Sequence, residues 1–254
     1  MGIVLNEYNW AREMIAAHDL GKKPYETLCR VARYYLNVRH CTTKETRRML
    51  DRFLIECDPT ASLPKWAATL DHAMVAAKKR DGIEIDSITI TLPEIETIET
   101  LETKPLKRLA FTLLCLAKYW SIVNPNSDHW VNTKDSEIMR MANISTSLKR
   151  QSELYRTLFE RGLVKFSKKV DNTNVQVCFV QGGATALEVT DFRNLGWQYL
   201  KYQGGPFFEC YNCGLTVKYS DPVHGKHQRY CKDCAIKIRT QQSVNAVMKR
   251  RHYG

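Results

Sequence analysis

Four cysteines near the end of the chain have the residue type and the spacing that suit metal binding. They form two Cys-x-x-Cys pairs, Cys210/Cys213 and Cys231/Cys234, with 17 residues between the pairs. A two-residue spacer lets one tight turn direct both sulfurs at one ion, and Gly214 can take the positive φ that closes such a turn. The spacing therefore predicts one structural Zn²⁺ bound by Cys210, Cys213, Cys231 and Cys234.

Other interpretations of these residues are open but explain less. His224 and His227 lie between the pairs and could replace a thiolate, although a solvated loop tip accounts for them more simply. A redox-active pair needs a thioredoxin-like βαβ setting, and the surrounding sequence predicts none. The remaining cysteines are scattered and odd in number, which favours a reducing compartment over a disulfide framework; they are Cys29, Cys41, Cys57, Cys115 and Cys178.

The composition predicts a basic globular protein of two or three compact parts. The chain has 254 residues, of which 44% are hydrophobic and 26% charged. Its 38 Lys and Arg exceed its 27 Asp and Glu, and the net charge of +11 favours a polyanionic partner. Neither a signal-peptide pattern nor an apolar run of about 18 residues occurs. We therefore expect a cytoplasmic protein without a membrane partner or a small-molecule substrate.

Residues 1–80 are expected to form a helical bundle. Apolar residues recur at steps of three and four in four segments, and the loops between them are short. Helix-start signals precede these segments, including Pro24 and the capping box of Thr42 and Glu45. The expected helices cover residues 6–17, 24 to about 36, the segment from the capping box at 42–45 through Leu54, and 62–78.

Residues 81–103 are expected to be an acidic connector. Residues 81–102 include seven acidic side chains and no basic one, which makes them a poor nucleic-acid contact. Two short strands at 83–85 and 88–90 precede a helix that begins at a second capping box, Thr91 and Glu94. A surface for a protein partner is the alternative interpretation of this segment.

Residues 104–203 have the order of elements of a winged helix-turn-helix domain with an extension at its C-terminal end. A long apolar helix is followed by a short strand, a helix capped by Asn132 or Thr133, a turn at Asn143 and a third helix capped by Ser147. Two strands around a lysine-containing tip would form the wing. These elements are expected at 104–123, 130–131, up to about 142, 148–161, 163–168 and 174–180.

The third of these helices carries the candidate nucleic-acid contacts. Its core side is expected to hold Leu154, Tyr155, Leu158 and Phe159. The opposite side would face a major groove with Lys149, Arg150 and Arg156. Further phosphate contacts are expected at the wing, from Lys168 and Lys169, and in the tail, from Lys249, Arg250 and Arg251.

Residues 204–254 are expected to form a zinc ribbon followed by a basic helical tail. Gly204, Gly205 and Pro206 would act as a hinge before it. Segments 215–219 and 226–230 are expected to pair as a hairpin beside the metal. Residues 201–254 hold ten Lys or Arg against three Asp or Glu, so this end of the chain is strongly basic.

Some of these patterns resemble known proteins. The helix spacing in residues 1–80 resembles the helical modules that follow the catalytic domain in some phage and plasmid primases. The ribbon, which ends in Tyr-Cys-x-x-Cys-Ala before a helix rich in Lys, Arg and Gln, is similar to the C-terminal ribbons of phage-encoded proteins of unassigned function. The succession of helical module, winged helix and ribbon also resembles phage or prophage products of that type. This resemblance implies action in the cytoplasm of a bacterial host.

A search for catalytic motifs favours a binding protein over an enzyme. The sequence has no Walker loop, no Gly-x-Ser-x-Gly and no His-Glu-x-x-His. An HNH-type nuclease would use His224, Asn245 and His252, but the last two lie in a basic segment with helical character. His40 and Cys41 are adjacent, and no third group is available to orient them as a catalytic pair.

The sequence as a whole predicts a mainly α protein of the α+β class that binds nucleic acid, most simply DNA, without enzymatic activity. Transcription control and replication initiation are the tasks that fit. The alternative is an adaptor or inhibitor that grips a host protein, such as an anti-defence or host-takeover factor, with the zinc purely structural.

Overall fold

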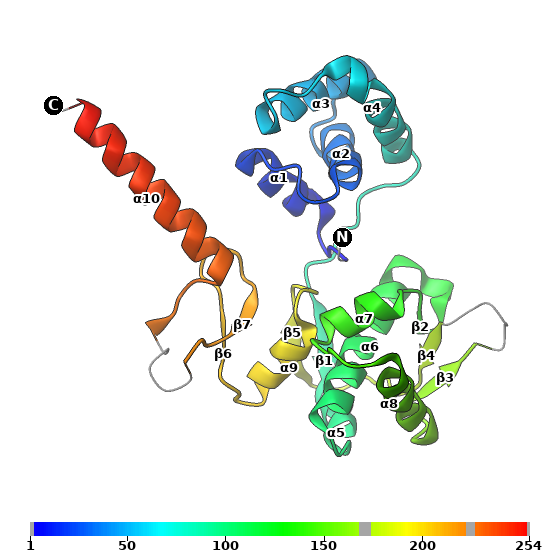
Figure 1. Ribbon diagram of the computed structural model, residues 1–254. Coiled ribbons are helices and arrows are strands. Elements are labelled where there is room, and N and C mark those ends of the chain that lie inside the picture. Colours follow the sequence, from blue (N-terminus) through cyan, green and yellow to red (C-terminus); the bar gives the residue numbers. More distant parts are fainter. Residues whose placement is uncertain (1–2, 168–173, 222–226, 253–254) are drawn as a thin grey trace. The chain divides into compact units, whose positions relative to one another are not determined.

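The chain folds into two compact units, Met1–Ser87 and Ile88–Gly254. The structure is a computed structural model that describes residues 3–167, 174–221 and 227–252 (Figure 1). The described part is mainly helical, with small antiparallel sheets in the second unit. None of its helices combines the length and the apolar character that crossing a membrane requires. The boundary between the units, after Ser87, lies within the segment 81–103.

The first unit is built from four α-helices around one apolar core. The expected start signals are present: Pro24 begins the second helix, and Thr42 and Glu45 form a complete capping box. The Asn6 side chain caps the first helix. The second helix continues into a π-helical segment instead of ending at Leu36. The elements are α1 (Glu7–Ala17), α2 (Pro24–Arg33), η1 (Tyr34–Val38), α3 (Thr43–Cys57) and α4 (Leu63–Lys78).

Glu7, at the start of α1, is the centre of a buried ion-pair cluster. Its side chain is 2% exposed and lies 3.1 Å from Arg30 Nε, 3.0 Å from Arg33 Nη1 and 3.0 Å from Arg80 Nη2. The backbone N–H of Ile83 also donates to its carboxylate at 3.3 Å. This one carboxylate therefore fastens α1 to α2 and to the segment that follows α4.

The second unit is organised around α6 (Lys104–Val123), whose bounds match the expected helix. Eleven of its residues are buried, and α5 (Leu92–Glu99) and α9 (Leu195–Tyr202) pack against it. Strands β1 (Ile88–Thr91) and β5 (Thr185–Val189) pair antiparallel beside this helix. Segments that are far apart in the sequence thus meet around one long apolar helix.

Glu94 ties these elements together, because its carboxylate is fully buried and accepts hydrogen bonds from three segments. The donors are the Thr91 backbone at 2.8 Å, the Gln181 backbone at 2.9 Å and Lys118 Nζ at 2.7 Å. The capping box predicted for Thr91 and Glu94 is confirmed. Glu99 likewise pairs with Lys107 at 2.6 Å, so two carboxylates of the acidic segment serve contacts within the unit.

Two helices and a three-stranded sheet follow α6. The turn between the helices begins at Asn143, whose φ is +55°, and Ser147 accepts a hydrogen bond from the Arg150 backbone N–H as expected of a cap. Gly162 follows the second helix with φ +71°. The elements are η2 (Pro125–Ser127), β2 (Trp130–Val131), α7 (Asp135–Met141), α8 (Leu148–Glu160), β3 (Val164–Phe166) and β4 (Val175–Val177), with strand order β2-β4-β3.

Two details predicted for these helices are wrong. Neither Asn132 nor Thr133 caps α7, which begins after Lys134 without a side-chain cap. The Thr133 hydroxyl instead accepts a hydrogen bond from Trp120 Nε1 at 3.0 Å. Phe159 is 49% exposed rather than part of the core, and its ring stacks on that of Phe166, which is also exposed, with centroids 5.3 Å apart.

Gly196, in the first turn of α9, allows that helix to lie against the turn after α7. A Cβ at this position would stand 2.0 Å from the backbone oxygen of Ala142. We therefore expect Gly196→Ala to lower the free energy of unfolding by about 1–3 kcal/mol, because backbone must move to accommodate the methyl group. Urea unfolding would measure the loss. Gly182→Ala is the matched control, since no heavy atom lies within 4 Å of its Cβ position; an equal loss in both variants would contradict this account.

Candidate metal centre and nucleic-acid interface

The four cysteines of the two Cys-x-x-Cys pairs come together in one cluster. Strand β6 (Phe207–Glu209) pairs with β7 (Thr216–Lys218), and the turn that joins them carries Cys210 and Cys213. Cys231 precedes α10 (Lys232–His252), and Cys234 lies in the first turn of that helix. All four sulfurs lie within 4.8 Å of one another.

The sulfur positions suit one tetrahedral ion. The Sγ atoms of Cys213 and Cys231 are 3.8 Å apart. A tetrahedral metal with bonds of about 2.3 Å to sulfur places its ligands about 3.8 Å from one another. A disulfide would need about 2.05 Å, so these cysteines are free thiols in a cluster that can hold a metal ion.

Backbone and side-chain donors surround the sulfurs unevenly. The Asn212 amide donates to Cys234 Sγ at 3.4 Å, and the Cys234 backbone N–H donates to Cys231 Sγ at 3.5 Å. Burial would raise the pKa of Cys210, but backbone N–H groups of Cys231, Cys213 and Asn212 lower it to about 6. Burial raises the pKa of Cys213 to about 12 and also raises that of Cys231. Since thiolates held this close repel one another, a divalent cation is what allows all four to ionise together.

The hairpin beside the cluster differs from the expected one. Segment 215–219 was expected to pair with 226–230, whereas β7 pairs with β6, which precedes the first cysteine. The Cys210 backbone N–H donates to the Leu215 carbonyl at 2.9 Å and thereby closes the metal-binding turn. His224 lies outside the described residues. His227 is exposed and is not among the clustered ligands of the part that the structure describes.

Contacts with the segment before α9 hold the cysteine hairpin in place. Arg193 Nη2 donates to the Cys213 carbonyl at 2.6 Å, and the same guanidinium pairs with Asp191 at 2.7 Å. Asn194 Nδ2 donates to the Thr216 carbonyl at 2.9 Å. No motif in the sequence marks these residues, because their partners lie about twenty positions further along the chain.

Asn194 also links the hairpin to the turn that precedes α8. Its Oδ1 accepts a hydrogen bond from Asn143 Nδ2 at 2.9 Å, and Asn143 Oδ1 accepts one from the Trp197 backbone at 3.1 Å. Arg108 donates to the Asn143 carbonyl at 2.9 Å. The helix-joining turn, α9 and the cysteine hairpin therefore share one polar network.

The expected hinge at 204–206 is used as the end of α9. Gly204 has φ +78°, and its N–H and that of Gly205 donate at 2.9 Å to the carbonyls of Lys201 and Leu200. This pattern terminates a helix with a left-handed residue. Lys201 also pairs with Glu209 at 2.6 Å, so side chains on either side of the glycines are joined.

The outer face of α8 is exposed, but two of its arginines have acidic neighbours on the same helix. Arg150 pairs with Glu153 and Arg156 with Glu160, both at 2.7 Å. Lys149 is exposed and makes no ion pair in the described residues. Exposed i,i+3 and i,i+4 pairs contribute only about 0.3–0.5 kcal/mol each, so phosphate can compete with the glutamates for these cations.

The other candidate contacts are only partly described. Lys168 and Lys169 lie outside the described residues. Lys249, Arg250 and Arg251 fall within the bounds of α10, but their side chains are outside the description. Upstream of them, residues 239–246 are exposed along the helix, and the sequence has no acidic residue after Asp233.

Comparison with known proteins gives no relative. No protein family, curated protein or solved structure matches this chain. Its site must therefore be interpreted from its own geometry, and the resemblance to phage-encoded proteins stays a prediction.

Proposed function

We propose that the chain is a non-enzymatic nucleic-acid-binding protein that docks α8 in a DNA groove and uses the basic helix α10 as a second contact. The observation that carries this proposal is the succession of α6, α7, the turn at Asn143, α8 and the sheet β2-β4-β3. That succession is the order of a winged helix-turn-helix, in which the second helix of the pair enters the major groove.

Charge and exposure support the same proposal. The α8 side chains that point away from the core include Lys149, Arg150 and Arg156, all exposed. Ser147 caps the helix, whose N-terminal turn is open to solvent, and helix N-termini attract phosphate. The net charge of +11 favours capture of a polyanion before docking.

The metal in this proposal is one structural Zn²⁺ held by Cys210, Cys213, Cys231 and Cys234. Four thiolates leave no open position for substrate, which is the arrangement of a structural rather than a catalytic zinc site. The ion would fix the β6–β7 turn to the start of α10. It would thereby fix the start of the basic helix relative to the β6–β7 hairpin, which contacts α9.

Arg150→Ala/Arg156→Ala tests the role of α8. We expect the double variant to bind a random-sequence DNA duplex about tenfold or more weakly than the unaltered chain, because each arginine supplies a phosphate or base contact. Fluorescence anisotropy with a labelled duplex measures the dissociation constant.

The matched control is Lys23→Ala/Arg52→Ala. Lys23 and Arg52 form the same i,i+3 and i,i+4 pairs, with Glu26 at 2.9 Å and Glu56 at 2.7 Å, in the first unit. This control variant loses the same net charge as the α8 variant, but at positions outside α8. Its affinity for DNA should therefore remain within about twofold of that of the unaltered chain at moderate salt. An equal loss in both variants would mean that net charge, rather than α8, determines the affinity.

A further inference from the structure

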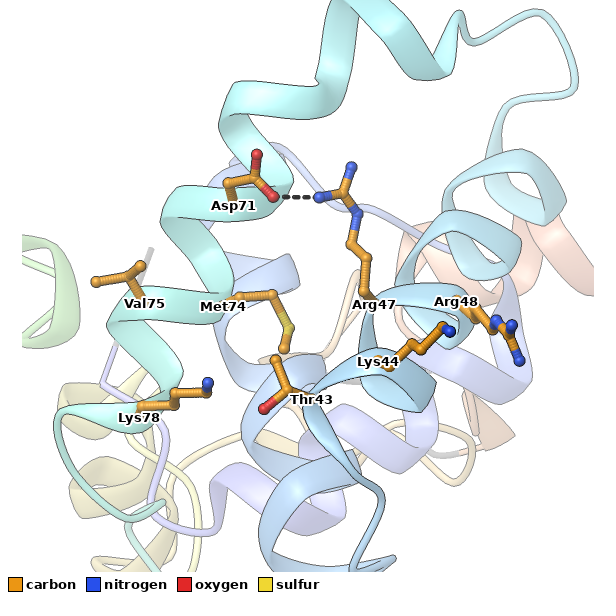
Figure 2. A pocket seen from close by; sticks show the side chains of 8 residues that line it. All are labelled: Thr43, Lys44, Arg47, Arg48, Asp71, Met74, Val75 and Lys78. Atoms are coloured by element: carbon orange, nitrogen blue, oxygen red, sulfur yellow. Dashed lines mark hydrogen bonds and ion pairs between the residues drawn. The ribbon is translucent and has the colours of Figure 1, made fainter.

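The first unit contains a groove between α3 and α4 that the proposed nucleic-acid interface does not use. Its volume is about 550 Å³. The first turns of α3 form one wall and the second half of α4 forms the other (Figure 2). Charged and apolar side chains share the lining, and those that matter here are Lys44, Arg47, Arg48, Met74, Val75 and Lys78.

Positive charge dominates the rim of this groove. Asp71 is the acidic residue of the lining, and it forms an ion pair with Arg47 across the two helices (Figure 2). Lys44, Arg48 and Lys78 are exposed, and within the described residues no carboxylate stands at ion-pair distance from them. Arg48 lies near enough to Glu45 for the two charges to interact, but Lys44 and Lys78 add further positive charge around the same concavity. The resulting positive potential attracts an anionic ligand.

The floor of the groove is apolar. The Met74 side chain extends from α4 toward α3, whereas Val75, on the next position of α4, points away from α3 at the edge of the lining and is 56% exposed (Figure 2). A methionine can adapt its shape to an incoming apolar group, because its side chain is unbranched and flexible. The groove therefore suits a ligand that combines an apolar anchor with flanking negative charge.

We propose that this groove docks an acidic segment of a partner protein. One apolar side chain of that segment packs on Met74 and Val75, and its carboxylates pair with Lys44, Arg48 and Lys78. Nucleic acid fits the groove less well. The lining contains no aromatic ring on which a base of a single strand could stack. A duplex backbone would contact the cations but leave the apolar floor uncovered.

The test uses the full zinc-loaded chain and a fluorescein-labelled peptide in which leucines are separated by pairs of glutamates. Lys44→Glu/Lys78→Glu is expected to weaken peptide binding at least tenfold, because it places like charges against the ligand. Lys22→Glu/Lys65→Glu makes the same change of net charge at exposed positions of the same unit outside the groove, and should weaken binding less than threefold. Val75→Ser and a peptide with serine in place of leucine should each weaken binding about fivefold or more.

Three results would overturn the proposal. The first is no measurable peptide binding to the unaltered chain. The second is an equal effect of the two charge reversals. The third is loss of duplex or single-stranded DNA binding in Lys44→Glu/Lys78→Glu beyond that in its control, which would make the groove a nucleic-acid contact. Because the groove lies outside α8 and α10, Arg150→Ala/Arg156→Ala should leave peptide binding unchanged, so failure of one proposal is distinguishable from failure of the other.

Discussion

Cys231→Ser is expected to abolish metal binding and to unfold the segment from β6 to the first turns of α10. The buried cluster of this segment consists of Cys210, Cys231 and Cys234, with few apolar side chains packed against it. A core this small needs additional stabilisation, such as a bound metal or a disulfide, in order to fold. Structural zinc supplies about 10–16 kcal/mol of apparent binding free energy in isolated zinc-finger peptides near pH 7, so losing a ligand removes most of what holds this segment.

Metal analysis and hydrogen exchange measure the two parts of this prediction. The unaltered chain should carry one zinc ion per molecule, and Cys231→Ser should carry none and lose amide protection in β6 and β7. Cys178→Ser is the control, because Cys178 is exposed and outside the cluster. A Cys231→Ser protein that kept full protection in β6 and β7 would show that the cluster folds without a metal.

Loss of the metal should also weaken the contacts that position the turn before α8. Asn194 contacts both the Thr216 carbonyl in the hairpin and the Asn143 side chain in that turn. Unfolding of the hairpin removes the first of these contacts and leaves the Asn194 amide without its acceptor. The account therefore links the metal to the placement of α8 through one identified side chain.

Glu7→Gln is expected to destabilise the first unit by about 3–5 kcal/mol, because it leaves three guanidinium groups around an uncharged amide in a largely buried site. Two of the three, those of Arg30 and Arg33, are at most 14% exposed. Urea unfolding of the full chain measures the change. Glu26→Gln removes an exposed carboxylate that pairs with Lys23, and should cost less than about 1 kcal/mol.

The effect of Glu7 also has a defined pH dependence. Burial alone would raise its pKa, but hydrogen bonds and charges from Arg80, Arg33 and Arg30 hold the pKa below the ordinary value of 4.5. A carboxyl with a lowered pKa in the folded state stabilises the protein above its unfolded-state pKa and loses that contribution as the pH falls through the folded-state value. The stability difference between the unaltered chain and Glu7→Gln should therefore be constant above about pH 5 and shrink at lower pH. A difference that grew on acidification would contradict this assignment.

Local features of this fold are predictable from the sequence, whereas its long-range contacts are not. The bounds of α6 and the caps at Thr42, Thr91 and Ser147 depend on residues a few positions apart. The gathering of the four cysteines follows from a spacing that suits metal binding. Their physical causes can thus be seen in the sequence. The short strands β3 and β4 follow from alternation around a polar tip in the same way.

The predictions made from the sequence are wrong where tertiary contacts determine the position of a side chain. Thr133 was expected to cap α7, but Trp120 on the preceding helix takes its hydroxyl. Phe159 satisfies the helical period of the core side, yet it lies near the end of α8 and stacks on Phe166 at the surface instead. Periodicity assigns a face of a helix but not where the core ends along it.

Long-range contacts at the candidate site were likewise not predictable from the sequence. Spacing identified the four clustered cysteines, but not Arg193 and Asn194, which hold the cysteine hairpin from a distant segment. The pairs of Arg150 with Glu153 and of Arg156 with Glu160 are local, and their spacing of three and four positions on one helix would have indicated them. The groove between α3 and α4 depends on the packing of the two helices, which no pattern in the sequence indicates.

The most direct test of the central claim is the affinity of the zinc-loaded chain for a random-sequence DNA duplex between about 50 and about 200 mM salt. The account predicts that the logarithm of the association constant falls linearly with the logarithm of the salt concentration, with a total loss of about a thousandfold for roughly six phosphate contacts. A chain that ends at Thr240 keeps all four cysteines and lacks Lys249, Arg250 and Arg251, so its slope should be shallower by about two to three. No retention at the lowest salt, or an affinity that does not respond to salt, would contradict nucleic-acid binding as the function of this protein.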